Sequence, residues 1–499
     1  MDATTVELGS ESERMADRDD ACLRTGASYK EALRDGRAVW AAGERVADVT
    51  ENPVLGPGID LIAETFDAQF EPDLRGITTY VNDQGERVSR SWQVPHEQAD
   101  FAARRELIRY TTYKTAGSFG RPPDFAPLIA LGLLARKPMF ADSKPLIGAG
   151  DANFADNIDR YIEYGQRHNI IAAEVLADPQ ADRSAGSSAS AGLLRITSHD
   201  QHGVRLRGAK SVASIGAQAD EIIFTNLLRP DFPPEACVWG AIPVATEGLK
   251  LVCREAVSHP GADRFDHPLA SRGEEADQLL IFDDVFVPNE RLFNVGDPNL
   301  LKLYGPVTVW AHWHILCRLW FKAELFVGVG QLVVDTLGTG GFPQVRAYMA
   351  DLIQYAQQLK ACVLAAEGLA AVSEGGVLAP DVNMLTAGRL FSIEEYPRII
   401  HTIQELCGQG LVMRFTRADF DDAEIGPLLN ELLPGKGLNA ADKNRLMNFV
   451  WDLTTDSHAG RTELFENVNA TPANFLRDRL YREYGREGAM RTAREIAGI

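Results

Sequence analysis

The sequence lacks paired cysteines. Six cysteines are spread over 499 residues, and none lies within a few positions of another. Zinc sites and iron–sulfur clusters usually draw on cysteines in close pairs, so this spacing argues against both kinds of centre. We predict no metal site and interpret the cysteines as reduced residues that are mostly buried. They are Cys22, Cys237, Cys253, Cys317, Cys362 and Cys407.

Positive charge and long apolar runs are also scarce. The chain has 50 Lys and Arg against 70 Asp and Glu, a formal net charge of −20, so its surface repels a nucleic-acid backbone. No uninterrupted apolar stretch reaches the roughly 18 residues of a membrane-spanning helix. The acidic, polar N-terminus lacks a signal-peptide pattern, and we predict a disordered tail over residues 1–22. The composition predicts a cytoplasmic protein that binds neither nucleic acid nor membrane.

Nucleotide-binding fingerprints are missing as well. Short glycine clusters occur at 56–58, 148–150, 328–330 and 338–341, but none completes G-x-G-x-x-G after a strand. A phosphate loop of the form G-x-x-x-x-G-K-[ST] is absent too. Ordinary turns explain these glycines, and a Rossmann or P-loop site is not expected. If the chain is a redox enzyme, its reducing power comes from elsewhere.

The sequence does contain a clear change of pattern along the chain. Helical spacing dominates residues 23–167, apart from two short hairpins around Gly43 and Asn82–Gly85. Short β-branched runs follow over residues 168–288 and indicate an antiparallel barrel or sandwich. Residues 289–499 return to long amphipathic stretches, which suit a helical bundle. The pattern predicts an α+β protein with an N-terminal mainly helical domain, a middle antiparallel β-barrel domain and a C-terminal helical bundle.

Three stretches contain residues that could bind a ligand, and each can also be interpreted as purely structural. The aromatic stretch 310–314 could line a substrate pocket or pack in the core. The small-residue run 208–224 could let the backbone approach a flat ring, or form a tight β-corner. "SHAGRTELFE" (457–466) offers a Gly-Arg turn that could hold a pyrophosphate or a ring carbonyl, or only an ion pair at a helix start. The pocket candidates are Trp310, His312 and Trp313, and the ring-edge candidate is Ser214.

Seven stretches, taken in order, resemble one family. Each is short, but seven in the same order over nearly the whole chain are specific. The sequence resembles the 4-hydroxyphenylacetate 3-hydroxylase family, the oxygenase component of two-component flavin monooxygenases. The stretches are "RTGASYKEALRDGRAVWAAGERVADVTENP" (24–53), "GRPPDF" (120–125), "DPQADR" (178–183), "GAKSVAS" (208–214), "DHPLASR" (266–272), "FDDVFVPNERLF" (282–293) and "AGRTELFE" (459–466).

The resemblance implies an acyl-CoA-dehydrogenase-like fold and a homotetramer. It also implies that reduced FAD is supplied by a separate NAD(P)H-dependent flavin reductase, which agrees with the missing nucleotide fingerprints. Flavin contacts would fall on two stretches and on Ser214, with Arg183 and Arg461 supplying charge and Ser214 a hydrogen bond to the ring. The two stretches are Gln180, Ala181, Asp182 and Arg183, and His458, Ala459, Gly460 and Arg461.

The sequence departs from the family pattern where the substrate hydroxyl would lie. The family carries a histidine four residues before the Asp-Pro turn, and Glu174 occupies that position here. In a desolvated pocket Glu174 could have a raised pKa and act as a general base or acid. Alternatively, it pairs with Arg183, Lys210 or Arg461 and only shapes the site.

A second departure concerns the helix before "GRPPDF". The family carries an Arg and a Tyr there, and ungapped counting meets the residues from Tyr113 to Ala116. A shifted register gives Arg109 and Tyr113, an i,i+4 pair on one helix face. Both registers stay open, and Arg109 and Tyr113 are the catalytic candidates beside Glu174.

The leading prediction is an FAD-dependent monooxygenase, the oxygenase component of its system. It would use reduced FAD and O₂, through a C4a-hydroperoxyflavin, to hydroxylate an aromatic, phenolic or related activated substrate in specialised metabolism. The substrate is a free small molecule or is bound to a carrier. A flavin-binding lyase, isomerase or cyclase of the same fold is the alternative, and a non-catalytic scaffold with a decayed flavin site is a third reading.

Overall fold

A computed structural model describes residues 20–148, 150, 152–182, 184, 186, 190, 192–469 and 471–499. Most of the predicted tail, and Arg183 of the predicted flavin stretch, lie outside these described residues. The chain divides into two compact units. The first unit comprises Met1–Ala262, Ala270–Ala311 and Val372–Leu378, and the second comprises Asp263–Leu269, His312–Ala371 and Ala379–Ile499. The predicted helical segment and the predicted β-rich segment, apart from Asp263–Leu269, fall in the first unit, and the domain boundaries at residues 167 and 288 stay predictions.

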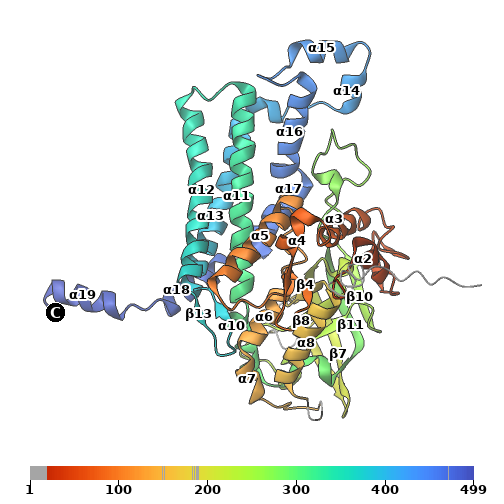
Figure 1. The fold of residues 1–499 in the computed structure, drawn as a ribbon, viewed down its shortest axis with the longest axis vertical. Coiled ribbons are helices and arrows are strands. Elements are labelled where there is room, and N and C mark those ends of the chain that lie inside the picture. The colour runs from red at the N-terminus through yellow and green to blue at the C-terminus, as the bar shows by residue number, and fades with distance from the viewer. Residues whose placement is uncertain are drawn as a thin grey trace, which may run out of the picture. The chain divides into compact units, whose positions relative to one another are not determined.

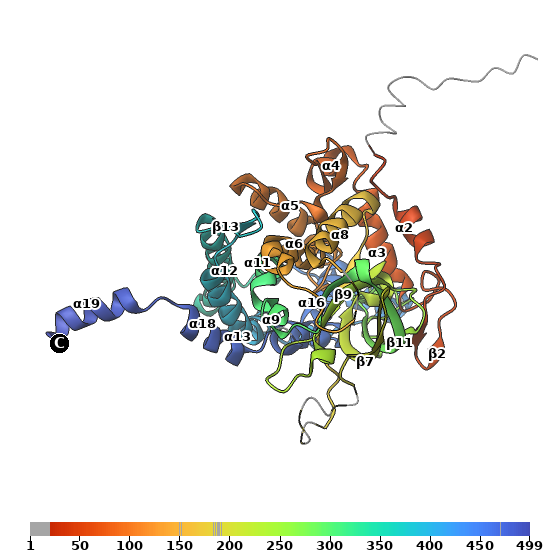
Figure 2. The ribbon, with the colours of Figure 1, turned by 90° about the horizontal axis from the view of Figure 1, so that it is seen from below.

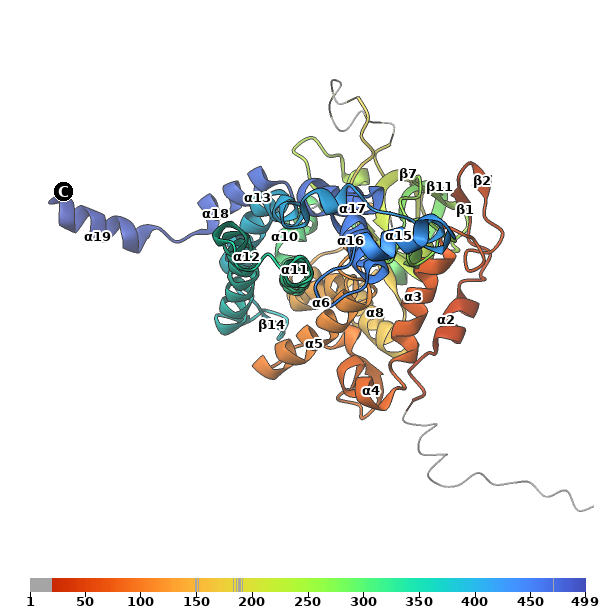
Figure 3. The same ribbon diagram turned by 90° about the horizontal axis from the view of Figure 1, so that it is seen from above.

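The helices of the first unit begin and end where the sequence supplies caps and prolines. α6 starts at Pro127, α5 opens with a capping box between Glu97 and Asp100, and the Asn153 side chain caps α8. α8 ends at Asn169, whose φ of 47° is left-handed. Figure 3 shows α2 next to α3, on which it packs. The bounds are α2 Gly26–Ala32, α3 Gly56–Asp67, α4 Pro72–Thr78, α5 Gln98–Lys114, α6 Pro127–Ala135, α7 Lys137–Ala141, α8 Phe154–His168, α9 Pro298–Leu301 and α10 Tyr304–Val307.

The described strands of the first unit form a six-stranded sheet, β2-β1-β10-β11-β7-β6, and a four-stranded sheet, β12-β9-β8-β5. Neighbouring strands are antiparallel except for the parallel pairs β1–β10 and β5–β8. Figure 2 shows the longest pair, β7 and β11, side by side. The bounds are β1 Val39–Ala41, β2 Glu44–Arg45, β5 Ala172–Val175, β6 Arg195–His199, β7 Gly203–Ser214, β8 Glu221–Thr225, β9 Val238–Pro243, β10 Leu249–Cys253, β11 Asp277–Pro288 and β12 Leu292–Val295.

These pairings differ from the predicted antiparallel barrel. The strands hydrogen-bond as two sheets, and an isolated bridge between Ala177 and Ser211 links the segment after β5 to β7. The sheets pack face to face, with the rings of Phe224 and Phe282 5.5 Å apart. The described pairings therefore close no barrel, because β5 lies parallel to β8 at an edge and has no ladder to the other sheet. A small separate hairpin, β3 Thr79–Val81 with β4 Arg87–Ser89, forms at the predicted turn.

The second unit is helical. Figures 1 and 3 show α11, α12 and α13 running side by side. Gly330 permits the close approach of α11 to α12, since a Cβ there would meet Leu352 Cδ1 at 2.8 Å. No helix of the described residues is both long and apolar enough to cross a membrane. The bounds are α11 Val309–Leu337, α12 Pro343–Gly368, α13 Val382–Cys407, α14 Arg417–Asp421, α15 Ile425–Leu432, α16 Ala440–Thr454, α17 Ser457–Leu464, a π-helical turn Phe465–Asn469, α18 Ala473–Glu483 and α19 Glu487–Ala497. Between α12 and α13 the chain forms the hairpin β13 Ala371–Val372 and β14 Leu378–Ala379, of which Val372–Leu378 belongs to the first unit.

Candidate active site

Glu174 lies in β5, and the strand register decides which way its side chain points. It pairs with Ile223 of β8, which in turn pairs with Ala241 of β9, so the three side chains share one face of the four-stranded sheet. Its neighbours Ala173 and Val175 are buried on the opposite face. Glu174 itself is only partly buried. The β5 register therefore places a carboxyl group where a ligand can reach it.

Two groups of the first unit act on this carboxyl group. The Tyr304 hydroxyl, at the start of α10, donates a hydrogen bond to Glu174 Oε1 at 3.0 Å. Burial among protein atoms raises the pKa of Glu174 to about 7, against the lowering effects of the Arg121 guanidinium and the Tyr304 hydrogen bond. Burial and the neighbouring Glu174 carboxyl also raise the pKa of Tyr304 well above its ordinary value. Near neutral pH, Glu174 can thus both accept and release a proton, while Tyr304 stays a donor.

Arg121 is held by the loop that follows α5. The chain turns there through Ala116 and Gly117, with φ of 49° and 68°. The Glu275 carboxylate accepts the backbone N–H groups of Gly120, at 2.7 Å, and of Arg121. The guanidinium lies 4.3 Å from the centre of the Phe125 ring, an arrangement that fixes a cation without neutralising it. Arg121 lies in the "GRPPDF" stretch but was not among the predicted site residues, although an Arg four residues before an aromatic residue in a turn was the available signal.

Arg109 and Tyr113 lie elsewhere on α5. Both are exposed, Tyr113 by 43%, and the Arg109 guanidinium pairs with Glu106 one turn earlier. Their part in catalysis stays a prediction, whereas Arg121 is the arginine that acts on Glu174. Tyr304 was missed altogether, because it is 130 positions from Glu174 and belongs to no recognisable motif.

The segment after Glu174 is fixed by Lys210 and its neighbour on β7. The buried Lys210 ammonium donates to the Leu176 carbonyl at 3.0 Å, to Asp178 Oδ1 at 2.7 Å and to Asn226 Oδ1. The Ser211 N–H donates to the Ala177 carbonyl at 2.7 Å. We call these contacts the β7 clamp, because they hold residues 176–178 one after another. Lys210 therefore serves Asp178, and not Glu174, as its carboxylate partner.

The remaining predicted flavin contacts of the first unit differ in exposure. Gln180, Ala181 and Asp182 are exposed, and the Asp182 carboxylate accepts the Ser184 N–H at 2.9 Å, which lowers the pKa of Asp182. Ser214 is buried and donates to Asp277 Oδ1 at 2.8 Å. Just before it, Val212 has a φ of 60°, which is rare for a β-branched residue. Such local strain is typical of functional segments.

The other predicted flavin contacts lie in the second unit on α17. The Asp456 side chain caps this helix by accepting the His458 N–H at 3.0 Å. Burial, followed by the Arg461 charge, lowers the pKa of His458 to about 4, so its ring is neutral. The Arg461 guanidinium lies 4.2 Å from the Phe465 ring centre. Ala459 and Gly460 complete this turn, which presents a neutral imidazole and a cation close together.

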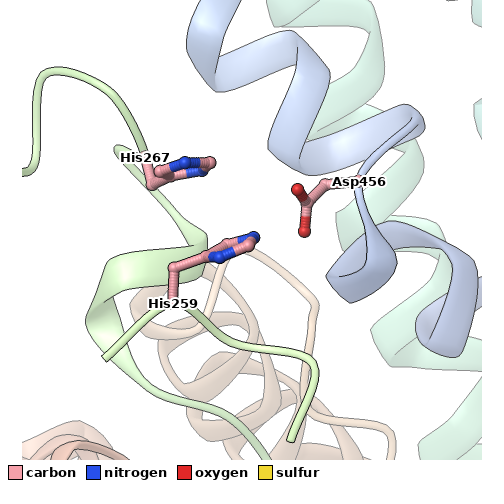
Figure 4. Close-up of side chains that lie close together, drawn as sticks. All are labelled: His259, His267 and Asp456. Atoms are coloured by element: carbon pink, nitrogen blue, oxygen red, sulfur yellow. The ribbon is translucent and has the colours of Figure 1, made fainter. Parts of the chain in front are cut away.

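Figure 4 shows Asp456 together with His267, which belongs to the same unit. His267 Nδ1 lies 3.1 Å from Asp452 Oδ1, and the other oxygen of Asp452 accepts the Leu269 N–H at 3.0 Å. The "DHPLASR" stretch is therefore tied to α16 by a single aspartate. His259, also labelled in Figure 4, belongs to the first unit.

The aromatic pocket candidates use their polar atoms for packing. Trp310 Nε1 donates to the Leu378 carbonyl at 3.1 Å in the first unit, and Trp313 Nε1 donates to Glu367 Oε1 at 3.0 Å in the second. Both indoles are fully buried, and His312 between them is partly buried. These hydrogen bonds indicate that the two tryptophans pack in the core and do not line a substrate pocket.

Comparison with known proteins supplies the family. Residues 25–294 match the N-terminal region of 4-hydroxyphenylacetate 3-hydroxylase, and residues 299–498 match its C-terminal region. The chain belongs to the 4-hydroxyphenylacetate 3-hydroxylase family. The predicted family and the acyl-CoA-dehydrogenase-like fold are thus confirmed.

Relatives span nearly the full length. The oxygenase component of 4-nitrophenol 4-monooxygenase/4-nitrocatechol 2-monooxygenase from Rhodococcus opacus is 32% identical, over 91% of this chain and 87% of its own. The oxygenase component of 4-hydroxyphenylacetate 3-monooxygenase from Thermus thermophilus is 30% identical, over 93% and 95%. A crystal structure of such a component complexed with FAD matches with a TM-score of 0.88 at 29% identity, covering 95% of this chain and 98% of that one. These relatives confirm the predicted class, a flavin-dependent monooxygenase acting as an oxygenase component.

Proposed function

We propose that this monooxygenase hydroxylates a phenol and that Glu174 takes up the phenolic proton. The supporting observation is the partly buried Glu174 carboxyl group, which accepts a hydrogen bond from the Tyr304 hydroxyl and has a pKa of about 7, raised by burial against the charge of Arg121. A base must have a pKa near the working pH to be both ionised and effective, and Glu174 meets this condition. An ordinary glutamate, with a pKa near 4.5, would be too weak a base for a phenol.

Each of the three side chains has a separate task in this proposal. Glu174 accepts the phenolic proton, which makes the ring electron-rich at the position to be hydroxylated. Tyr304 holds Oε1 of the carboxyl group, so that the other oxygen is directed to the substrate. Arg121 stays charged at every working pH and stabilises the phenolate that forms. The site thus replaces a histidine by a carboxyl group whose proton affinity has been raised by burial.

The residues present also fit FAD. In the second unit, the neutral His458 lies in the first turn of α17 and the Arg461 cation in its last turn, and a guanidinium is suited to hold a phosphate or a ring carbonyl. In the first unit, Ser214 is preceded by small residues over which the backbone can approach a flat ring closely. Bound reduced FAD supplies the oxygen-activating chemistry, and a separate NAD(P)H-dependent flavin reductase supplies the reduced cofactor.

The test is coupled turnover. Purified full-length chain, a flavin reductase, NADH, FAD and 4-cresol are incubated in air, and a catechol product is measured. We expect product with the wild-type chain and at least a tenfold loss with Glu174→Gln. The matched control is Glu163→Gln, which removes an exposed glutamate of α8. No catechol under these conditions, together with turnover of another substrate without oxygen or reductant, would instead support the lyase, isomerase or cyclase alternative.

Assembly and location are also proposed. We infer a cytoplasmic homotetramer whose substrate is a free or carrier-bound phenol. The described surface carries apolar side chains in a row on α15, at Ile425, Leu428 and Leu432, which are exposed by 46% to 72%. Sedimentation velocity on the full chain measures the oligomeric state directly. A monomer at micromolar concentration would contradict the tetramer.

A further inference from the structure

The short segment 272–277, which leads into β11, contacts both the Arg121 loop and the stretch that ends at Ser214, all within the first unit. We call this segment the strap. Its residue Glu275 is 2% exposed, and the carboxylate accepts the N–H groups of Gly120, at 2.7 Å, and of Arg121. Two adjacent N–H groups on one carboxylate restrain both the position and the direction of a peptide. The strap therefore fixes the backbone of the loop that carries Arg121.

The Arg121 guanidinium is tied to the same loop. Its Nη1 donates to the Gly120 carbonyl at 3.0 Å, and the group lies 4.3 Å from the centre of the Phe125 ring. Where α5 ends and the loop begins, Arg272 of the strap donates from Nη2 to the Lys114 carbonyl at 2.9 Å. Because these partners of the guanidinium belong to the loop itself, a shift of the loop backbone also shifts the cation.

The other side of the strap holds the stretch that we predict to contact the flavin. The Ser214 hydroxyl donates to Asp277 Oδ1 at 2.8 Å. The Arg254 side chain joins Asp277 to Glu275, since Nε donates to Asp277 Oδ2 at 2.7 Å and Nη2 donates to the Glu275 carbonyl at 3.0 Å. A continuous path of hydrogen bonds therefore runs from Ser214 to the Arg121 loop.

We propose, resting on the proposed function, that Glu275 is a positioning residue, which fixes Arg121 and the phenol beside it at the distance from the flavin ring that oxygen transfer requires. Ser214 marks the flavin side of the strap and Arg121 the phenol side. A misplacement of about 1 Å between reacting groups can reduce a rate about 100-fold. Oxygen transfer therefore depends on Glu275, although its carboxylate acts only through the loop.

The two possible fates of the oxygen give this proposal a direct readout. In coupled turnover the phenol, O₂ and reduced FAD give a catechol, water and oxidised FAD. When the phenol lies out of reach, the two electrons and two protons of reduced FAD convert O₂ into hydrogen peroxide, and the phenol is unchanged. Loss of positioning is therefore measured as peroxide in place of catechol, while the flavin is oxidised in both cases.

The experiment is a single turnover of the full-length chain. The chain, in excess over reduced FAD, is prepared without oxygen and mixed with aerated 4-cresol, and catechol and peroxide are measured per reduced FAD. Glu275→Gln keeps the size of the side chain but offers one oxygen to two N–H groups. We expect catechol per reduced FAD to fall by about tenfold or more, with peroxide in its place.

Hydrogen exchange measures the hold on the loop without turnover. In Glu275→Gln the backbone amides of Gly120 and Arg121 should exchange faster than in wild type, because one of them loses its acceptor. The Kd of oxidised FAD should stay unchanged, since the Glu275 side chain holds the loop and not the Ser214 stretch. This pattern separates positioning from a general loss of structure.

Glu274→Gln is the matched control. Glu274 is also 2% exposed, but its carboxylate accepts from Arg254 at 3.0 Å and from the Val257 N–H at 3.1 Å. It should therefore leave the catechol yield and the exchange of the loop amides as in wild type. If Glu275→Gln does not fold, Arg254→Lys replaces it: a lysine keeps the charge but cannot bond Asp277 and the Glu275 carbonyl together, so the yield should fall in the same direction.

The outcomes distinguish this proposal from the proposed function. If Glu275→Gln keeps the wild-type catechol yield, positioning by Glu275 is overturned while phenol hydroxylation stands. A lower yield with unchanged amide exchange, or an equal loss in Glu274→Gln, would mean that Glu275 does not act through the Arg121 loop, and it overturns the proposal as well. If the wild-type chain forms no catechol from 4-cresol, the proposed function itself fails.

Discussion

At the scale of single residues, Glu174 should make the stability of the protein depend on pH. Its pKa in the folded chain is raised from 4.5 to about 7, so the folded state binds the proton more tightly than the unfolded state does. This contribution is fully present below about pH 4.5 and is lost as the pH rises through about 7. Glu174→Gln should therefore be more stable than wild type at about pH 8.5, by up to about 3 kcal/mol, and show little difference at low pH.

The measurement is the urea midpoint of both proteins at about pH 5 and about pH 8.5. The difference between the two proteins removes the contribution of all other titrating groups. An equal difference at both pH values would mean that Glu174 ionises with an ordinary carboxyl pKa in the folded chain, and the proton chemistry proposed for it would lose its basis.

Arg121 offers a second prediction at this scale, because its charge lowers the pKa of Glu174. Arg121→Gln should move the rise of kcat/KM with pH to values above 7 and reduce kcat/KM by roughly 100-fold, since a cation facing the developing phenolate is lost. Arg121→Lys keeps the charge but not the flat guanidinium over Phe125, and it should recover part of the activity.

The comparison with Arg109 decides between the two arginines. Arg109→Gln removes a cation from the exposed face of α5, where it pairs with Glu106. If the pH profile of kcat/KM shifts with Arg109→Gln and not with Arg121→Gln, the catalytic arginine predicted from the sequence is the right one. If the profile shifts with Arg121→Gln and not with Arg109→Gln, Arg121 is the catalytic arginine.

The individual site residues also differ in whether they could be predicted from the sequence. Glu174 was found because it interrupts an apolar run before a family motif. Arg121 stood inside a quoted motif, but its role depends on a loop whose path is set by Ala116, Gly117 and the distant Glu275. Tyr304 could not be found, since only the folded chain brings its hydroxyl to Glu174. A site residue that lies next to a recognisable motif could be predicted from the sequence. A residue that reaches the site only through tertiary packing could not.

At the scale of elements, the β7 clamp should control how far water reaches the Glu174 carboxyl group, and therefore its pKa. Lys210 lies at the far side of the segment that follows β5 and has no direct contact with Glu174, so its influence runs through the Leu176 carbonyl and Asp178. Lys210→Met should loosen this segment and let water reach the carboxyl group. We expect the inflection of the pH profile to fall from about 7 towards the ordinary value of 4.5, together with a lower kcat/KM.

The matched control for the clamp is Lys250→Met. Lys250 also pairs with an aspartate on a strand, Asp283 at 2.7 Å, but it is 40% exposed. Removing such a surface pair should cost under about 1 kcal/mol and leave the pH profile unchanged. Lys210→Met should cost several kcal/mol, because it removes a buried ammonium and leaves the partly buried Asp178 carboxylate without one of its two cationic partners. If Lys210→Met lowers stability but leaves the inflection at about 7, the clamp supports the fold without positioning Glu174.

The helices and strands differ in how well the residue pattern of the sequence predicted their bounds. The β-branched runs that were predicted as strands form β6 to β11 with nearly the predicted bounds. This agreement arises because β-branched residues at every second position suit the buried face of a strand. Helix bounds are less evident from the sequence: α13 starts at Val382, where the Asp381 side chain caps it, and Pro397 lies inside the helix. The division into two sheets depends on which strands meet across the fold, and residue patterns along the chain do not contain that information.

At the scale of the whole molecule, the net charge of −20 should govern how fast FAD arrives. FAD carries a diphosphate, so the long-range field of the protein repels it. That field extends about 30 Å at 0.01 M salt and about 8 Å at 0.15 M. The association rate constant of FAD should therefore increase by several-fold between these salt concentrations.

Riboflavin provides the control, because it has the same ring without the phosphates. Stopped-flow flavin fluorescence should give an association rate for riboflavin that hardly changes with salt while that for FAD rises. A rate for FAD that falls with salt would mean that local cations, such as Arg461 in the last turn of α17, outweigh the net charge and attract the diphosphate over short range. The sign of this salt dependence thus measures whether the acidic surface or the flavin site dominates the approach of the cofactor.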